Sequence, residues 1–212
     1  MKYLLFAALM AAPAFAQIVA LGVKAGIPLG DAFAGSGSSD VTSAARRYLV
    51  GGTAELHLPL RFSVELDVIY KRTGFNSYFQ SLDIGRFSDR VTANQWEFPL
   101  LAKYEILGGR LRPFIDAGPV LRHMSGIADK YTYLTFFPFP GSSGSTTSNN
   151  SPALQHRNSP GFSVGGGVTW KILGVRISPE VRYTRWGTDT FEIEQSTTSN
   201  PNQEDLLVGF VF

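Results

Sequence analysis

Three segments of the chain carry a pair of aromatic residues eight positions apart, with mostly apolar residues at every second position between them. The pairs are Phe62 and Tyr70, Trp96 and Tyr104, and Phe162 and Trp170. Eight residues of β-strand, tilted by about 40°, rise about 20 Å along a barrel axis, which is close to the apolar thickness of an outer membrane. Aromatic side chains collect at both water interfaces of such a membrane. The spacing therefore predicts strands that cross a membrane.

The first residues have the layout of a secretory signal peptide. Lys2 is followed by an apolar stretch at residues 3–12 and by the small-x-small site Ala14-Phe15-Ala16. We expect cleavage before Gln17, so that residues 1–16 are the signal peptide and residues 17–212 the mature domain. An uncleaved membrane helix is the alternative, but a proline and a glycine interrupt the apolar run. No later segment is long and apolar enough for a spanning helix.

Eight segments alternate between apolar and polar residues and are expected to form strands. They lie at about 18–28, 47–58, 61–72, 91–106, 112–123, 161–172, 175–186 and 205–212. Long connections, at about 28–46, 73–90, 124–160 and 187–204, alternate with short ones. Outer-membrane barrels have short periplasmic turns and long external loops, and an even strand number places both termini on the periplasmic side. The aromatic residues then form two girdles. The girdle at the outer surface of the membrane contains Tyr48, Tyr70, Trp96, Phe162 and Tyr183, and the girdle at the periplasmic surface contains Phe62, Tyr104, Trp170 and Phe212.

The other face of these segments is polar and carries equal numbers of positive and negative side chains. They are Lys24, Glu55, Glu65, Asp67, Lys71, Glu97, Lys103, Glu105, Asp116, Arg122, Lys171, Arg176, Glu180 and Arg182. Eight strands leave a lumen just wide enough for side chains, so charges inside it must pair. A soluble, lipocalin-like cup would show the same alternation with the apolar face inward. Aromatic residues at both ends of the apolar face favour the membrane barrel with a closed, ion-paired lumen.

Composition excludes several classes of protein. The chain has no cysteine, so no disulfide holds the exported fold, and its net charge of +2 argues against a nucleic-acid partner. The histidines are too scattered along the strands to share a metal ion, and no phosphate-binding loop occurs. We therefore expect no metal and no cofactor.

The final segment, 206–212, alternates and ends on an aromatic residue, Phe212. It resembles the C-terminal strand of bacterial outer-membrane proteins, in which the terminal aromatic is part of the signal read by the assembly machinery. The resemblance implies that this machinery and the outer-membrane lipid are partners of the chain. We expect the barrel itself to be a monomer.

Three motifs carry a family resemblance. Glu97-Phe98-Pro99-Leu100, Arg112-Pro113-Phe114 with Gly118-Pro119, and Pro179-Glu180-Val181-Arg182-Tyr183 resemble the bacterial outer-membrane β-barrel domain family, the small OmpA-, OmpX- and PorT-like barrels. The resemblance implies an all-β fold: an eight-stranded antiparallel up-and-down transmembrane β-barrel in the bacterial outer membrane. The motifs specify architecture and very little chemistry.

One pair of residues is a candidate for catalysis. His123 and Ser125 lie at the outer end of a strand with the parity of the lipid-facing residues. A His-x-Ser pair in this place resembles the outer-membrane lipid A deacylases, in which serine is the nucleophile, histidine the base, and an acid orients the histidine. Here Gly126 replaces the asparagine of that family, Asp129 lies in the expected loop and Glu180 has lumen parity. We favour the interpretation of an interface histidine followed by a loop serine.

The long connection at 124–160 contains a candidate contact site. Its aromatic residues are Tyr131, Tyr133, Phe136, Phe137 and Phe139, followed by a Gly/Ser/Thr/Asn tract. They extend the hairpin above the membrane, fold over the barrel mouth or meet a partner. We therefore expect a structural or surface-interacting role through four long external loops rather than enzyme activity. A lipid A deacylase, a narrow small-molecule conduit and a soluble binding cup are the alternatives.

Overall fold

The computed structural model describes residues 19–30, 33–35, 40–43, 48–81, 85–135, 141–149, 154, 156–172, 174–188, 192–193 and 197–212. The expected signal peptide, residues 1–16, lies outside the described residues, as do Phe136, Phe137 and Phe139. Within the described part of the chain, no helix is long and apolar enough to cross a membrane.

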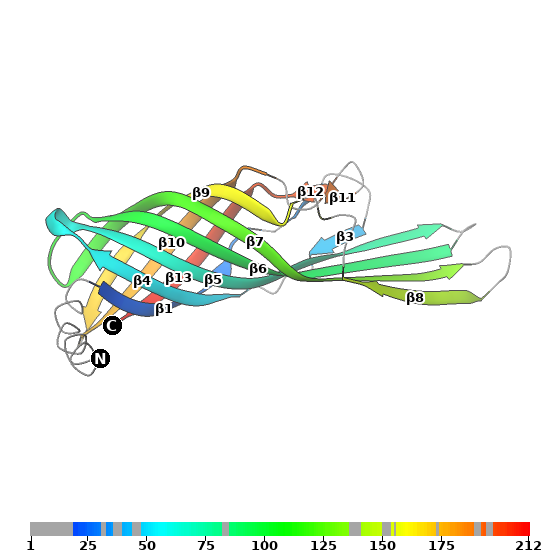
Figure 1. Ribbon diagram of the computed structural model, residues 1–212, viewed down its shortest axis with the longest axis horizontal. Helices are drawn as coiled ribbons and strands as arrows, with labels where there is room; N and C mark the ends of the chain where they lie inside the picture. The colour runs from blue at the N-terminus through cyan, green and yellow to red at the C-terminus, as the bar shows by residue number, and fades with distance from the viewer. Residues whose placement is uncertain are drawn as a thin grey trace, which may run out of the picture.

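Eight antiparallel strands form a closed barrel, as predicted (Figure 1). They are β1 (Val19–Pro28), β4 (Leu49–His57), β5 (Phe62–Ser81), β6 (Gly85–Glu105), β7 (Leu111–Thr135), β9 (Asn158–Ile172), β10 (Val175–Trp186) and β13 (Asn202–Val211). Each strand pairs with the next in this order, and β1 pairs with β13, which closes the ring. The Phe212 amide donates to the Leu21 carbonyl at 2.9 Å and continues that closure to the last residue. A closed ring leaves no unpaired sheet edge inside the lipid.

Smaller elements lie at the outer end of the barrel. Strands β2 (Phe33–Gly35), β11 (Glu192–Ile193) and β12 (Thr197–Ser199) form a separate small sheet, and β3 (Asp40–Ser43) pairs with the upper part of β5. Strand β8 (Ser142–Ser148) pairs with the upper part of β7. At the opposite end, a 3-10 turn η1 (Pro59–Arg61) joins β4 to β5.

Three barrel strands continue far beyond the membrane-spanning part. The pairing of β5 with β6 runs from the barrel to Ser81 and Gly85, and that of β6 with β7 runs to Thr135. We call residues 76–81, 85–90 and 128–135 of these strands, together with β8, the outer extension. Figure 1 shows it as a sheet that projects from the barrel on the side away from the C-terminus.

The outer extension corrects two predictions. The expected loop at 73–90 is wrong, because residues 73–81 and 85–90 are strand. The expected connection at 124–160 is wrong in part, because residues 124–135, 142–148 and 158–160 are strand. The segment at 73–90 includes polar residues such as Asn76 and Gln80, and Ser77 stands between Phe75 and Phe79, so the apolar alternation is interrupted. Above the lipid no apolar face is needed, because the backbone hydrogen bonds of the ladder can form with either kind of side chain outward.

A β-bulge separates the two parts of β7. The register of β6 with β7 shifts between Thr92 and Asn94, and Gly126 on β7 has a φ of +55°. The extra residue reverses the inside and outside faces of β7 at this point. His123 and Ser125 therefore share the outward face below the bulge, whereas Ile127 above it is turned inward and buried.

Candidate functional site

The centre of the lumen is filled by a cluster of buried charges. Lys24 on β1 extends its Nζ to three carboxylates: it contacts Glu65, and it lies 3.1 Å from Asp67 Oδ2 and 3.0 Å from Glu180 Oε2. Arg182 on β10 bonds the same acids, with Nε 2.6 Å from Glu180 Oε1 and Nη2 2.9 Å from Asp67 Oδ2. All five side chains are no more than 3% exposed. The alternation of β1, β5 and β10 brings them to one level of the barrel.

The cluster continues toward the periplasmic end. Lys103 Nζ lies 3.2 Å from Glu65 Oε2 and 3.5 Å from Glu55 Oε1. Glu55 Oε2 also pairs with Arg176 Nη1 at 3.2 Å. Lys103 stands 4.1 Å from the centroid of the Phe114 ring. Burial of charge is tolerated here because each carboxylate has more than one cationic partner.

A second, smaller group lies toward the outer end. Lys71 Nζ is 2.9 Å from Glu97 Oε1, and the Gln203 side-chain amide donates to the same oxygen at 3.1 Å. Gln203 also donates to Asp205 Oδ2 at 2.6 Å. The guanidinium of Arg122 stacks on the Trp186 ring at 4.1 Å. These contacts link β5, β6, β7, β10 and β13 across the barrel.

The remaining predicted lumen residues lie apart from these groups. Glu105 pairs with Arg112 Nη1 at 2.9 Å near the periplasmic end. Asp116 is buried, and neither of its carboxylate oxygens has a hydrogen-bond partner among the described residues. Lys171 is exposed at the periplasmic mouth.

Sequence reasoning missed several inward-facing residues. Asp205 and Gln203 were placed at or before the start of the last strand, although Asp205 has the parity of the buried Leu207. Arg112 has the parity of Asp116 and Arg122 on the same strand. Arg112 and Asp205 lie inside the expected strands 112–123 and 205–212, so their parity alone would have found them, and Gln203 needs the last strand to begin two residues earlier.

A cluster of apolar side chains lies above the charges, where β5, β6 and β7 leave the barrel. They are Phe75, Val91, Ala93, Met124 and Ile127, with Leu154 packed against them, and we call them the outer plug. Its five buried members are at most 5% exposed. Full burial of a Val, Ile, Phe or Met side chain stabilises the folded state by about 1.5–3 kcal/mol. The strand members of the outer plug come from the neighbouring strands β5, β6 and β7, on the outer side of Lys71 and Glu97.

The aromatic residues named as girdles lie at two levels of the barrel wall. Tyr70 and Trp96 are register partners with ring centroids 5.1 Å apart, and Phe62 and Tyr104 are partners 4.8 Å apart. Trp96, Phe162, Trp170, Tyr48, Phe62 and Phe212 are exposed on the outer wall, and Tyr70, Tyr104 and Tyr183 are half-buried. Between the two levels the wall is covered with exposed Leu, Val, Ile and Phe side chains. A wall of this kind is matched to lipid.

The pair His123 and Ser125 does not form a catalytic arrangement among the described residues. The His123 Nδ1 lies 2.7 Å from Asn158 Oδ1. Within the described ranges no hydrogen bond joins Ser125 to His123, and no carboxylate lies within 4.0 Å of the histidine ring nitrogens. Asp129, the nearest acid in sequence, is turned inward above the bulge.

The outer extension presents aromatic rings on one face. Phe87 stacks on Tyr131 with centroids 6.3 Å apart at 23°, and Tyr131 is 6.3 Å from Tyr133. This is the face that continues from the outer plug, because the three residues share its parity. Tyr78 points to the opposite face of the sheet. In the part of the chain that the structure describes, β8 pairs with β7 alone and so forms a sheet edge.

The carboxyls of Asp89 and Asp129 also lie on this face of the outer extension, above the membrane. Asp89 opposes Tyr131, and Asp129 opposes Val91, so the two acids are diagonal neighbours on β6 and β7. Burial, together with the hydrogen bond and charge of Asp129, raises the pKa of Asp89 to about 7. No group of three or more His, Cys, Asp or Glu side chains in the described ranges is arranged to hold a metal ion.

A closed antiparallel barrel with an apolar outer wall and a charged interior defines the class of integral outer-membrane β-barrel proteins. The chain belongs to the outer membrane protein beta-barrel domain family, whose model matches residues 3–212. It is thus a bacterial outer-membrane protein, and the alternative of a soluble cup is wrong.

Solved structures of other small barrels are similar to this one. OprG from Pseudomonas aeruginosa has 16% identity and a TM-score of 0.49, covering 92% of this chain and 94% of that chain. Neisserial surface protein A has 14% identity and a TM-score of 0.46, covering 92% of this chain and 95% of that chain. Ail of Yersinia pestis has 11% identity and a TM-score of 0.37, covering 92% of this chain and 97% of that chain. Comparison with curated proteins gave no match.

Proposed function

We propose that this protein is a non-conducting barrel that acts at the cell surface through the outer extension. One observation carries the proposal: a sheet with stacked aromatic rings on one face projects from the barrel, and among the described residues its strand β8 pairs with β7 alone (Figure 1). Exposed aromatic surface and unpaired strand edges are both features of interaction sites. The barrel would then serve as a rigid anchor for this sheet.

Two features of the lumen support the non-conducting part of the proposal. The ion pairs around Lys24 and Arg182 occupy the centre of the barrel, and the outer plug lies on the outer side of them along β5, β6 and β7. A path for solutes would need the ion pairs to open. The conduit alternative is therefore less well supported than a surface role, and the deacylase alternative lacks an acid beside His123 among the described residues.

The surface role can be tested by trimming the outer extension. Replacing residues 77–89 by Asn-Gly joins Asn76 to Arg90, and replacing residues 131–146 by Asn-Gly joins Lys130 to Thr147; each junction connects register partners. Two-residue Asn-Gly turns close antiparallel hairpins, so the barrel should be retained. Heat-modifiability on a gel reports whether it is.

Cells that display the native or the trimmed protein are then compared for adhesion to surfaces coated separately with fibronectin, laminin, collagen or heparin. We expect the native protein to promote adhesion to at least one surface and the trimmed protein to lose it. A finer pair is Tyr131→Ser against Tyr78→Ser, since the two rings are 41% and 39% exposed on opposite faces. Equal adhesion with native and trimmed protein on every surface would contradict the proposal.

A further inference from the structure

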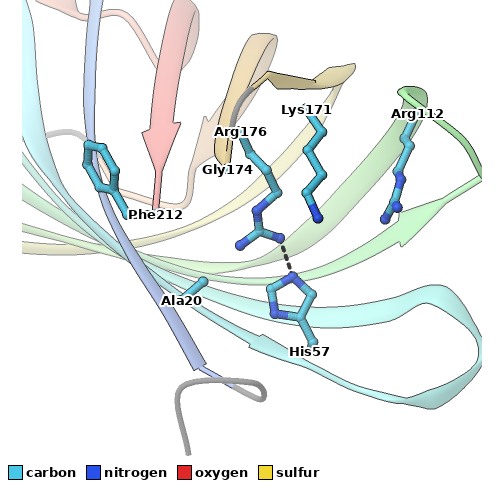
Figure 2. Close-up of a pocket in the computed structure, with 7 residues that line it drawn as sticks. All are labelled: Ala20, His57, Arg112, Lys171, Gly174, Arg176 and Phe212. Carbon is cyan, nitrogen blue, oxygen red and sulfur yellow. Dashed lines mark hydrogen bonds between the residues drawn. The ribbon is translucent and has the colours of Figure 1, made fainter. Parts of the chain in front are cut away.

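A cavity of about 290 Å³ opens at the periplasmic end of the barrel. His57, Arg112, Lys171 and Arg176 line it, together with Phe212 at its rim. Figure 2 shows these basic side chains extending from β4, β7, β9 and β10 into the same space. The surface role proposed for the outer extension does not involve this cavity.

The charges around the cavity do not balance. Arg176 contacts the His57 ring and pairs with Glu55, but Glu55 is shared with Lys103. Arg112 pairs with Glu105. Lys171 forms no ion pair in the described part of the chain, and its side chain is exposed.

Basic residues also surround the mouth on the neighbouring turns. Arg61 donates to the carbonyl of Ile106 at 3.2 Å, and the carbonyl of Arg110 accepts from the Lys171 amide at 3.1 Å. Both arginines therefore sit at the same end as the cavity. An uncompensated positive charge in a partly enclosed mouth attracts anions.

We propose that this cavity binds a phosphate group. Two guanidinium groups supply planar forks of N–H donors, which match phosphate oxygens, and the Lys171 ammonium adds a mobile point charge. Several donors directed at one space suit a group with several acceptor oxygens better than a single carboxylate, which has two. A phosphate group fits within a cavity of this volume.

The position of the cavity admits two sources for that group. Phe62, Tyr104 and Phe212 lie at the end of the barrel where the membrane meets the periplasm. A phospholipid headgroup of the inner leaflet and a soluble phosphate ester of the periplasm can both reach this level. Both sources would present the same chemical group, a phosphate, to the basic side chains of the cavity.

The test uses the whole protein, purified from outer membranes into octyl glucoside, a detergent without phosphate. Inorganic phosphate is titrated by isothermal calorimetry, and dihexanoyl phosphatidylglycerol below its micelle concentration is titrated separately. We expect saturable binding of at least one, weakened by added sodium chloride because the donors are near solvent. Lys171→Gln should weaken that binding about tenfold, the loss of one charge-assisted hydrogen bond.

Controls separate this site from general charge attraction. Lys130→Gln removes the same charge from the outer extension, at an exposed position, and should leave the affinity unchanged. Arg112→Gln should weaken binding as Lys171→Gln does, and heat-modifiability shows whether each variant is folded. Tighter binding of phosphatidylglycerol identifies a lipid headgroup as the source, and tighter binding of inorganic phosphate identifies a soluble ester; each outcome supports the site.

Three results would overturn the inference. The first is the absence of saturable binding of either ligand to the native protein. The second is an unchanged affinity in folded Lys171→Gln and Arg112→Gln. The third is acetate binding as tightly as phosphate, which would show a general anion atmosphere instead of a phosphate site.

Discussion

The lumen and the outer extension are built on the same strands but are stabilised in different ways. Inside the membrane, β5 turns Glu65 and Asp67 inward to ion pairs and Leu66 and Val68 outward to lipid. Above the membrane, the same strand carries polar residues on a backbone ladder. The comparison teaches that lipid imposes a strict alternation, whereas water permits strand without it. Stability should therefore reside in the lumen and adaptability in the outer extension.

The largest expected effect is the loss of a central cation. Arg182→Met leaves Asp67, Glu180 and Glu65 with fewer partners in a buried site. Breaking a buried ion pair from one side costs about 3–5 kcal/mol. Urea-induced unfolding in lipid vesicles measures the free energy of unfolding, and Lys130→Met in the outer extension serves as the matched control. A similar small loss for both variants would remove the distinction between the two regions.

The outer plug should come next. Phe75→Ala empties a site that is 1% exposed, and we expect a loss of about 3 kcal/mol from the removed contacts and the remaining cavity. Tyr78→Ala, three residues further along β5 and 39% exposed, should cost much less. The same unfolding experiment compares them. If the two substitutions cost the same, the outer plug does not form a packed core.

The bulge that reverses the faces of β7 predicts a smaller effect. Gly126→Ala places a side chain at a φ of +55°, where a Cβ would lie 2.6 Å from Asn94 Nδ2, and should cost about 1–2 kcal/mol. Gly52→Ala is the control, since its nearest neighbour would be 3.9 Å away. Equal stability of the two alanine variants would show that the bulge is not required.

The smallest effect is a pH dependence confined to the outer extension. Because the pKa of Asp89 is raised to about 7 in the folded protein, the folded state holds its proton more tightly than the unfolded chain. Local stability should then fall as pH rises from about 4 to about 7 and stay level above it. Amide hydrogen exchange, corrected for intrinsic rates, should show less protection in β6 and β7 at pH 8 than at pH 5.5.

Asp89→Asn provides the control for that measurement. It should abolish the difference between the two pH values in the outer extension, while the amides of β13 serve as an internal reference. A pH dependence that persists in Asp89→Asn would assign the effect to another group.

The sequence predicted the barrel well, because lipid imposes a pattern that can be read. Apolar alternation and aromatic spacing predicted the strand number and the antiparallel order, and the fold confirms them. Polar parity assigned Lys24 and Glu65 to the interior, where the structure places them. It could not give their partners, since pairing across the lumen depends on the stagger of the strands.

Two features escaped the sequence for physical reasons. In the strands at residues 73–81 and 85–90, polar residues such as Ser77 and Asp89 interrupt the apolar alternation, so periodicity gave no clear signal there. The bulge at Gly126 shifts the register by a single residue, so odd-numbered residues of β7 face outward below the bulge and inward above it. Asp129 thus faces inward above the bulge, although its parity is that of the lipid-facing residues below.

Conductance in a planar bilayer tests the central claim most directly, namely that the lumen is filled and the protein acts from outside the membrane. The native protein, purified from outer membranes, is inserted and recorded at both polarities. With the ion pairs around Lys24 and the outer plug in place, we predict no current steps above the lipid baseline. Stable, voltage-independent steps from the native protein would show an open path through the barrel and contradict the account.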